Sequence, residues 1–329
     1  MRLLREMTAT TTRRWRLVMP LLALLGCGPA ADAQPHAGGD GGAAVAEAPA
    51  PVGKELTKAW VRIERNNDGD PLAMQTAIVR FVPANDYDPD KKPEDYDAYV
   101  DLVGAVHIGD QSYYDGLNRR FRDYDAVLYE LVAAKGTVVP RGRGTSNSHP
   151  LGALQNAMKS MLEVEHQLEK IDYTRPNFVH ADLSPDEFLK SMDDRDETFI
   201  QLYFRIMGAS LAQQSQQKAD EGSPEVEFMA ALLASDRARR FKVMLAKQFE
   251  GMESLMLALS GPQGSTLITA RNTRALDVLE ERLDDGDDKL AIFYGAGHLA
   301  DMTQQLEKRF DMRPVSCEWL EAWDLRVKE

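Results

Sequence analysis

Two of the six histidines share a local pattern with glycine: His107 follows Gly104 by three positions, and His298 follows Gly295 by three. With glycine at about 7% of residues, roughly 0.4 such cases are expected among six histidines, so two are suggestive. An imidazole titrates near neutral pH and is the commonest protein ligand for transition metals. The two histidines are therefore candidates for proton transfer or metal binding.

A carboxylate accompanies these histidines at a corresponding place in the chain. His107 and His298 each follow an apolar run, and Glu130 lies at the end of the run after His107. Ligands of open α/β sheets bind beyond the carboxyl ends of the strands. Two imidazoles and one carboxylate suit a divalent ion such as Mn, Co or Zn, and a bound ion lowers the pKa of its water. The alternative to a metal site is a structural role for each residue. The histidines would be hydrogen-bonded polar residues, Glu130 would form a salt bridge, and Gly295 and Gly297 would make a tight turn.

The elements that must position these residues follow from hydrophobic periodicity and turn residues. Strands are expected at residues 59–64, 75–82, 99–106, 125–132, 289–294 and 313–319. Helices are expected from Asp110, from Ser184, over residues 269–283 and from Leu299. A strand, helix and strand over residues 99–132 form a βαβ unit, whose strands run parallel.

This order of elements predicts one α/β domain over residues 55–329. Both ends of the domain contribute to a mixed or mostly parallel sheet, and a large helical insertion occupies about residues 151–260. One helix of the insertion begins at a capping box formed by Ser184 and Glu187.

Composition excludes two classes of protein. The 329-residue chain carries a formal net charge of −13, which argues against a nucleic-acid partner because such binding depends on clustered Lys and Arg. Only two cysteines are present, Cys27 and Cys317, so a disulfide-stapled scaffold is excluded. We expect Cys317 to lie in a terminal strand as a small hydrophobic residue.

The N-terminus has the pattern of an export signal. Arginines precede a short apolar run that ends in Leu24-Leu25-Gly26-Cys27, which resembles the lipobox of bacterial lipoproteins. We expect residues 1–26 to be a lipoprotein signal peptide, Cys27 to carry lipid, and residues 27–54 to be an Ala/Gly/Pro-rich tether in the cell envelope. Membrane contact is expected through this lipid only. The alternative is plain secretion with cleavage after Ala33, and either the general or the twin-arginine route remains open.

Four segments together resemble the TraB/GumN/Tiki family, which is related to erythromycin esterases and haem-binding ChaN-like proteins. They are Val103-Gly104-Ala105-Val106-His107, Tyr124-Asp125-Ala126-Val127-Leu128-Tyr129-Glu130, Arg271-Asn272 and Tyr294-Gly295-Ala296-Gly297-His298-Leu299. The order and approximate spacing agree over residues 99–132 and 267–315. Position 105 is Ala where many members have Thr, and residues 151–260 carry no matching motif.

The resemblance implies an α/β fold and, from the animal members, a metal-dependent protease. Its ligand or catalytic set would be His107, Glu130 and His298, with Glu130 as ligand or general base. Arg271 would stabilise an oxyanion or bind a substrate carboxylate, a task suited to its planar fork. Four neighbouring positions would contact the substrate: Gly104, Asn272, Gly295 and Gly297.

The middle segment adds two candidates of its own. His180 and Asp182 are two residues apart, so they would share a face of a strand and could supply accessory ligands. The alternative is a local hydrogen-bonding pair before the helix at Ser184.

The sequence therefore leaves two alternative functions for the same predicted pocket. The first is a metal-dependent hydrolase of the envelope that cleaves a peptide or related acyl bond in a peptide or protein substrate. The second is a non-catalytic envelope protein that binds a peptide or haem-like ligand. Loss of turnover in His107→Ala would favour the first.

Overall fold

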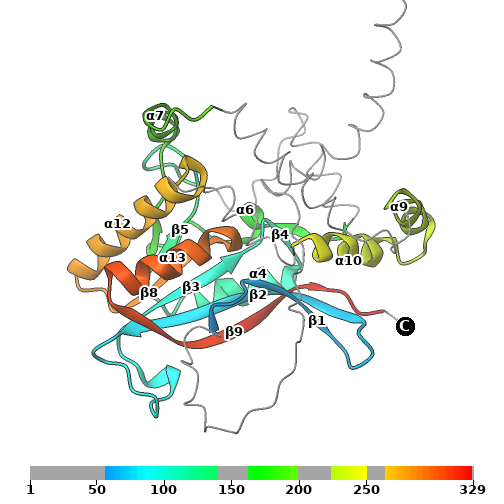
Figure 1. The fold of residues 1–329 in the computed structure, drawn as a ribbon, viewed down its shortest axis with the longest axis horizontal. Coiled ribbons are helices and arrows are strands. Elements are labelled where there is room, and N and C mark those ends of the chain that lie inside the picture. Colours follow the sequence, from blue (N-terminus) through cyan, green and yellow to red (C-terminus); the bar gives the residue numbers. More distant parts are fainter. Residues whose placement is uncertain (1–55, 140–161, 199–223, 250–263, 328–329) are drawn as a thin grey trace, which may run out of the picture.

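The computed structural model describes residues 56–139, 162–198, 224–249 and 264–327. These form an α/β fold in which helices cover both faces of a seven-stranded mixed sheet, as the sequence predicted (Figure 1). The predicted signal peptide, Cys27, the tether and parts of the helical insertion lie outside the described residues.

One side of the sheet is antiparallel. Strand β2 (Pro71–Pro83) pairs with β9 (Met312–Asp324) along one side, and with β1 (Val61–Arg65) and β3 (Tyr99–Ala105) along the other. The C-terminal strand thus joins the N-terminal ones, which confirms that both ends of the domain build the sheet. Cys317 lies half-buried in β9, as predicted.

The other side of the sheet is parallel. Its strands run in the order β3, β8 (Lys289–Gly295), β5 (Ala126–Tyr129) and β7 (Phe178–His180). Strand β7 comes from the segment predicted to be a helical insertion, so this segment also completes the sheet. The sequence suggested a strand here through His180 and Asp182, and the observed strand includes His180 and ends before Asp182.

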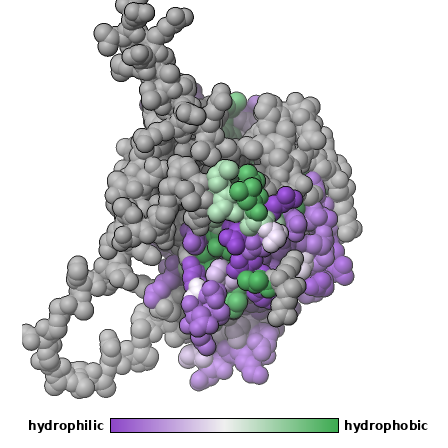
Figure 2. All heavy atoms as spheres, turned by 90° about the vertical axis from the view of Figure 1, so that its right-hand side faces the viewer, coloured by the Kyte–Doolittle hydropathy of each residue, from purple (hydrophilic) through white to green (hydrophobic). Residues whose placement is uncertain are grey.

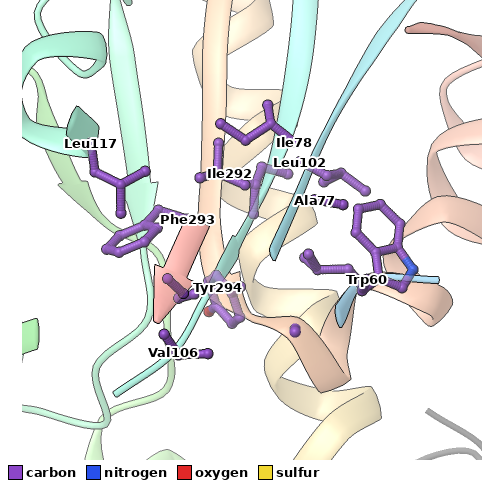
Figure 3. Packing of buried hydrophobic residues seen from close by; sticks show 14 of the residues in the cluster. Trp60, Ala77, Ile78, Leu102, Val106, Leu117, Ile292, Phe293 and Tyr294 are labelled. Atoms are coloured by element: carbon purple, nitrogen blue, oxygen red, sulfur yellow. The ribbon is translucent and has the colours of Figure 1, made fainter. Parts of the chain in front are cut away.

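Alternation along β8 shows which helices cover which face. The Phe293 ring packs against Phe121, just after α4 (Gln111–Arg120), and points toward Leu117 of α4 (Figure 3). The next residue, Tyr294, contacts His298 of α13 (Ala296–Arg309) on the opposite face. Helix α12 (Arg271–Asp284) packs beside β5 and α13. The sheet is therefore the middle layer of three.

The central strands are nearly continuous runs of buried apolar residues, as expected for strands covered on both faces. Asp101 of β3 is the polar exception. Arg80 donates two hydrogen bonds of 2.9 Å to its carboxylate, and the Tyr124 hydroxyl donates one of 2.6 Å. The buried charge is thus fully paired.

The remaining elements surround this core. A two-stranded sheet of β4 (Ile108–Gly109) and β6 (Glu165–His166) leads into α6 (Gln167–Lys170). Helix α7 (Pro185–Asp194) begins at the predicted capping box of Ser184 and Glu187. Four shorter or peripheral elements complete the set: the 3₁₀ turn η1 (Pro93–Asp95), the π-helical turn η2 (Thr266–Ala270), α9 (Pro224–Leu233) and α10 (Arg237–Phe249).

One predicted helix start is confirmed in position, and another helix begins earlier than predicted. Asp110 precedes α4 as expected, but its side chain does not cap the helix; it accepts hydrogen bonds of 2.6 Å from Lys242 and from the Asp324 backbone N–H. It thereby ties α4, α10 and β9 together. The last helix starts at Ala296 instead of Leu299, so His298 lies inside the first turn of α13.

The surface near α9 and α10 is shown in Figure 2, where small apolar patches lie among polar residues. Helix α9 contributes exposed Met229, Leu232 and Leu233 to the described surface. No described helix combines the length and apolar character needed to cross a membrane.

Candidate functional site

Each of the four parallel strands has one residue of the site at its carboxyl end or within two residues beyond it. His107 follows β3, Gly295 ends β8, Glu130 follows β5 and Asp182 follows β7. Because these strands are in register and parallel, their ends lie along one edge of the sheet. His298 reaches the same edge from the first turn of α13. This is the edge at which ligands bind in open α/β sheets.

Arg271, the first residue of α12, lies at the centre of the set. Its Nε donates to Asp182 Oδ1 at 3.0 Å, and its Nη2 donates to Asp182 Oδ2 at 2.6 Å and to Glu130 Oε1 at 2.7 Å. The side chain of Asp182 is fully buried, and those of Arg271 and Glu130 are 9% and 14% exposed. One guanidinium therefore joins two carboxylates from neighbouring strands.

The charges of this cluster stabilise one another. Burial opposes ionisation of Glu130, but the charges of Arg271, His298 and His107 and the Gly295 N–H together outweigh it, with Arg271 contributing most, and hold the pKa of that carboxyl far below its usual value. Burial also opposes the charge of Arg271, yet Glu130 and Asp182 raise its pKa above the ordinary value. Both groups remain charged at neutral pH.

Among the described residues, Nη1 is the guanidinium nitrogen of Arg271 that makes no short hydrogen bond. Its described contact is His298 Nε2, at 3.4 Å, whereas the other two nitrogens bond the carboxylates at 3.0 Å or less. His298 Nε2 also lies 3.7 Å from Glu130 Oε1. An N–H donor, a nitrogen acceptor and a carboxylate oxygen thus meet at one point.

His298 is buried and held at its other ring nitrogen. Its Nδ1 lies 2.6 Å from Asn272 Oδ1, and its ring packs edge-on against Tyr294. Burial lowers the pKa of His298 to about 4; Glu130 opposes this shift and the charge of Arg271 adds to it. His298 is therefore neutral at pH 7. Asn272, which the sequence predicted to contact the substrate, holds this histidine at Nδ1.

His107 is the exposed member of the set. Its Nδ1 lies 3.3 Å from Gln167 Oε1, and its backbone carbonyl accepts from the Gln167 N–H at 2.9 Å. Gln167 is buried and donates to the Tyr173 hydroxyl at 2.9 Å. The ring is close enough for its charge to lower the pKa of both Glu130 and His298.

The two predicted glycine–histidine patterns serve different purposes. Gly295 donates its N–H to Glu130 Oε2 at 2.7 Å, and a Cβ here would lie 3.2 Å from that oxygen. Gly104 lies inside the sheet, where a Cβ would lie 3.1 Å from the Ala77 carbonyl oxygen. Gly295 therefore shapes the site, whereas Gly104 allows close packing. Gly297 lies, half-buried, in the first turn of α13 beside His298.

His180 and Asp182, the predicted accessory ligands, contact different groups. His180 Nε2 lies 2.6 Å from the Leu131 carbonyl oxygen, so it carries the proton of that bond. Asp182 is committed to Arg271. The two side chains therefore have different hydrogen-bond partners.

As arranged, the predicted metal ligands do not fit a resident divalent ion. Both Glu130 oxygens already accept short hydrogen bonds, one from Arg271 and one from Gly295. An ion at His298 Nε2 would face a guanidinium nitrogen 3.4 Å from that atom, and like charges repel strongly in a buried site. Throughout the described ranges, no three His, Cys, Asp or Glu side chains gather as metal ligands would. The cation built into this cluster is Arg271.

Two neighbours of the site carried no signal in the sequence. Gln167 begins a four-residue helix, and Asp301 is one of many acidic residues on helix surfaces. Asp301 accepts from Asn272 Nδ2 at 2.8 Å. Its position three residues after His298 could have suggested a shared face only if the predicted helix had been extended to include His298.

Comparison of the chain with family models, with curated proteins and with solved structures found no match.

Proposed function

We propose that this protein is a hydrolase that cleaves a peptide or related acyl bond with water, using Arg271 and His298 and requiring no resident metal. The observation that carries the proposal is the 3.4 Å approach of Arg271 Nη1 to His298 Nε2 beside Glu130. It places a fixed positive donor next to a neutral proton acceptor, which are the two groups that acyl hydrolysis requires.

The steps follow from these atoms. His298 Nε2 takes a proton from water as the water oxygen bonds to the substrate carbonyl carbon. The carbonyl oxygen becomes an oxyanion, which Arg271 Nη1–H stabilises. When the tetrahedral intermediate collapses, the carbon–nitrogen or carbon–oxygen bond breaks, and the imidazolium returns its proton to the leaving amine or alcohol. The products are a carboxylic acid and an amine or alcohol.

The other members support these two groups. Glu130, 3.7 Å from His298 Nε2, stabilises the imidazolium formed in the first step. Asp182 and Glu130 fix the guanidinium plane, so no reorganisation is needed as the oxyanion develops. His107 contributes a second imidazole from the exposed side of the cluster.

We place the substrate outside the cytoplasm, because residues 1–33 have the pattern of a lipoprotein or secretory signal. A peptide or an envelope acyl compound is the class that fits this location.

The test is hydrolysis of a library of internally quenched peptides and a series of aryl esters by the purified full-length chain. For any substrate that is turned over, we expect kcat/KM to fall about 10²–10³-fold in Arg271→Lys, since the charge is kept but the donor fork is lost. His298→Gln should lose about 10²–10⁴-fold. The matched control is Arg274→Lys, one turn along α12 and paired with Glu281, which should keep wild-type activity.

A metal arm separates this mechanism from the metal-dependent one. Activity that survives EDTA, with well under one equivalent of metal after loading with Mn, Co or Zn, supports the proposal. Activity that is lost with EDTA and restored by one equivalent of metal contradicts it. Saturable uptake of a peptide or haem-like ligand without turnover would instead support the non-catalytic binding protein.

A further inference from the structure

The orientation of the Asn272 amide is fixed by two groups that can only accept. Its Nδ2 donates to the His298 carbonyl oxygen at 3.1 Å and to the Asp301 carboxylate at 2.8 Å. Neither oxygen has a proton to give, so the nitrogen of the amide must face them. Asn272 Oδ1 then faces His298 Nδ1 at 2.6 Å, and the shared proton lies on the histidine.

This arrangement is built across two helices. Asn272 is the second residue of α12 and is 1% exposed, while His298 and Asp301 lie three residues apart on α13. Residues with this spacing are neighbours on a helix surface. One amide can therefore reach the ring of His298 and the carboxylate of Asp301 at the same time.

The same proton placement suits the other side of the ring. With the proton on Nδ1, His298 Nε2 presents a lone pair to Arg271 Nη1–H. With the proton on Nε2, the N–H of His298 and the Nη1–H of Arg271 would point at each other. A flipped Asn272 amide would also direct its oxygen at two acceptors, the His298 carbonyl and Asp301.

We propose that Asp301 is a positioning residue that acts through Asn272 to hold His298 in the Nδ1–H tautomer, with its Nε2 lone pair facing Arg271 and Glu130. The catalytic meaning of this assignment rests on the proposed function, because a general base at residue 298 needs that lone pair. The tautomer itself is a property of the folded chain and can be measured without any substrate.

The experiment is a long-range ¹H–¹⁵N correlation spectrum of the full chain labelled with ¹⁵N-histidine, at pH 7.5. His298→Gln identifies the signals of residue 298. In the wild type we expect a protonated Nδ1 and an unprotonated Nε2, whereas a histidine side chain free in water prefers to carry the proton on Nε2. Asp301→Ala should raise the rate of Nδ1–H exchange with solvent by about tenfold or more, as expected for loss of a hydrogen bond to a charged group.

Asp301→Asn is the conservative variant, since its amide oxygen can still accept from Asn272, and it should restore slow exchange. A wild-type spectrum with the proton on Nε2 would overturn the proposal without any variant. Equal exchange in Asp301→Ala and wild type would also overturn the role of Asp301. A folded chain with the expected tautomer but no hydrolysis would reject the proposed function while leaving this assignment intact.

Discussion

Arg271 meets Asp182 through two parallel hydrogen bonds, from Nε to Oδ1 at 3.0 Å and from Nη2 to Oδ2 at 2.6 Å. The side chain of Asp182 is fully buried, and the carboxylate has no other charged partner among the described contacts. This pairing sets the plane of the guanidinium. It therefore decides which guanidinium nitrogen faces His298, although Asp182 itself touches neither histidine ring in any described contact.

Asp182→Asn tests the cost of losing this charge. Removing one partner of a buried ion pair typically costs about 3–5 kcal/mol, and we expect the lower end of that range because Glu130 still pairs with Arg271. The measurement is the free energy of unfolding from urea titration. The matched control is Asp194→Asn, which breaks the exposed pair with Lys190 and should cause no measurable change. Equal destabilisation in the two variants would contradict this account.

The sequence predicted the sheet and the positions of its strand ends because those signals are local. Buried strands are apolar runs that end where glycine or a polar residue begins, as at His107 and Glu130. Since parallel strands end at one edge, the predicted convergence required no knowledge of tertiary contacts.

The partners within the site were beyond such reasoning. Asp182 follows a strand of only three residues, and its pairing with Arg271 joins positions 89 residues apart. Gln167 faces His107 because their chain neighbours, His166 and Ile108, are paired in the short β4–β6 sheet. Residue types suggested a metal site, but they could not show that a guanidinium already pairs with Glu130.

The buried His298 should make stability depend on pH. Its pKa is about 4 in the folded protein against an ordinary 6.5, so between these values the unfolded chain binds a proton that the folded chain does not. Stability therefore falls as pH decreases through this window, by about 3 kcal/mol between pH 7 and pH 4. Glu130, whose pKa is lowered, adds a loss in the same direction below its ordinary value.

Urea titrations at pH 7, 6, 5 and 4 measure this dependence, and His298→Gln should flatten it between pH 6.5 and 4.5. An unchanged slope in that variant would show that another group is responsible.

The two glycines of the paired motif should respond differently to alanine. In Gly104→Ala the new methyl meets the Ala77 carbonyl and the side chains of Thr76 and Leu299, so overpacking should cost about 1–3 kcal/mol of stability. In Gly295→Ala it meets the Glu130 carboxylate and the His298 ring. There we expect a smaller loss of stability but a lower kcat/KM, because the displaced groups belong to the site. Thermal unfolding and turnover are measured on both variants. A larger stability loss in Gly295→Ala together with a larger loss of kcat/KM in Gly104→Ala would contradict this prediction.

Gln167 should be coupled to His107 in particular. Gln167→Met keeps the size of the side chain but removes the amide that lies 3.3 Å from His107 Nδ1. In a double-mutant cycle with His107→Ala, the unfolding free energies should show a coupling of about 0.5–1.5 kcal/mol, the net worth of one hydrogen bond. A parallel cycle of Gln167→Met with Cys317→Ala, on the edge strand β9, should be additive because the two residues share no described partner. Coupling in both cycles would mean that Gln167 supports the fold generally, whereas coupling only with His107 identifies it as the residue that holds this ring.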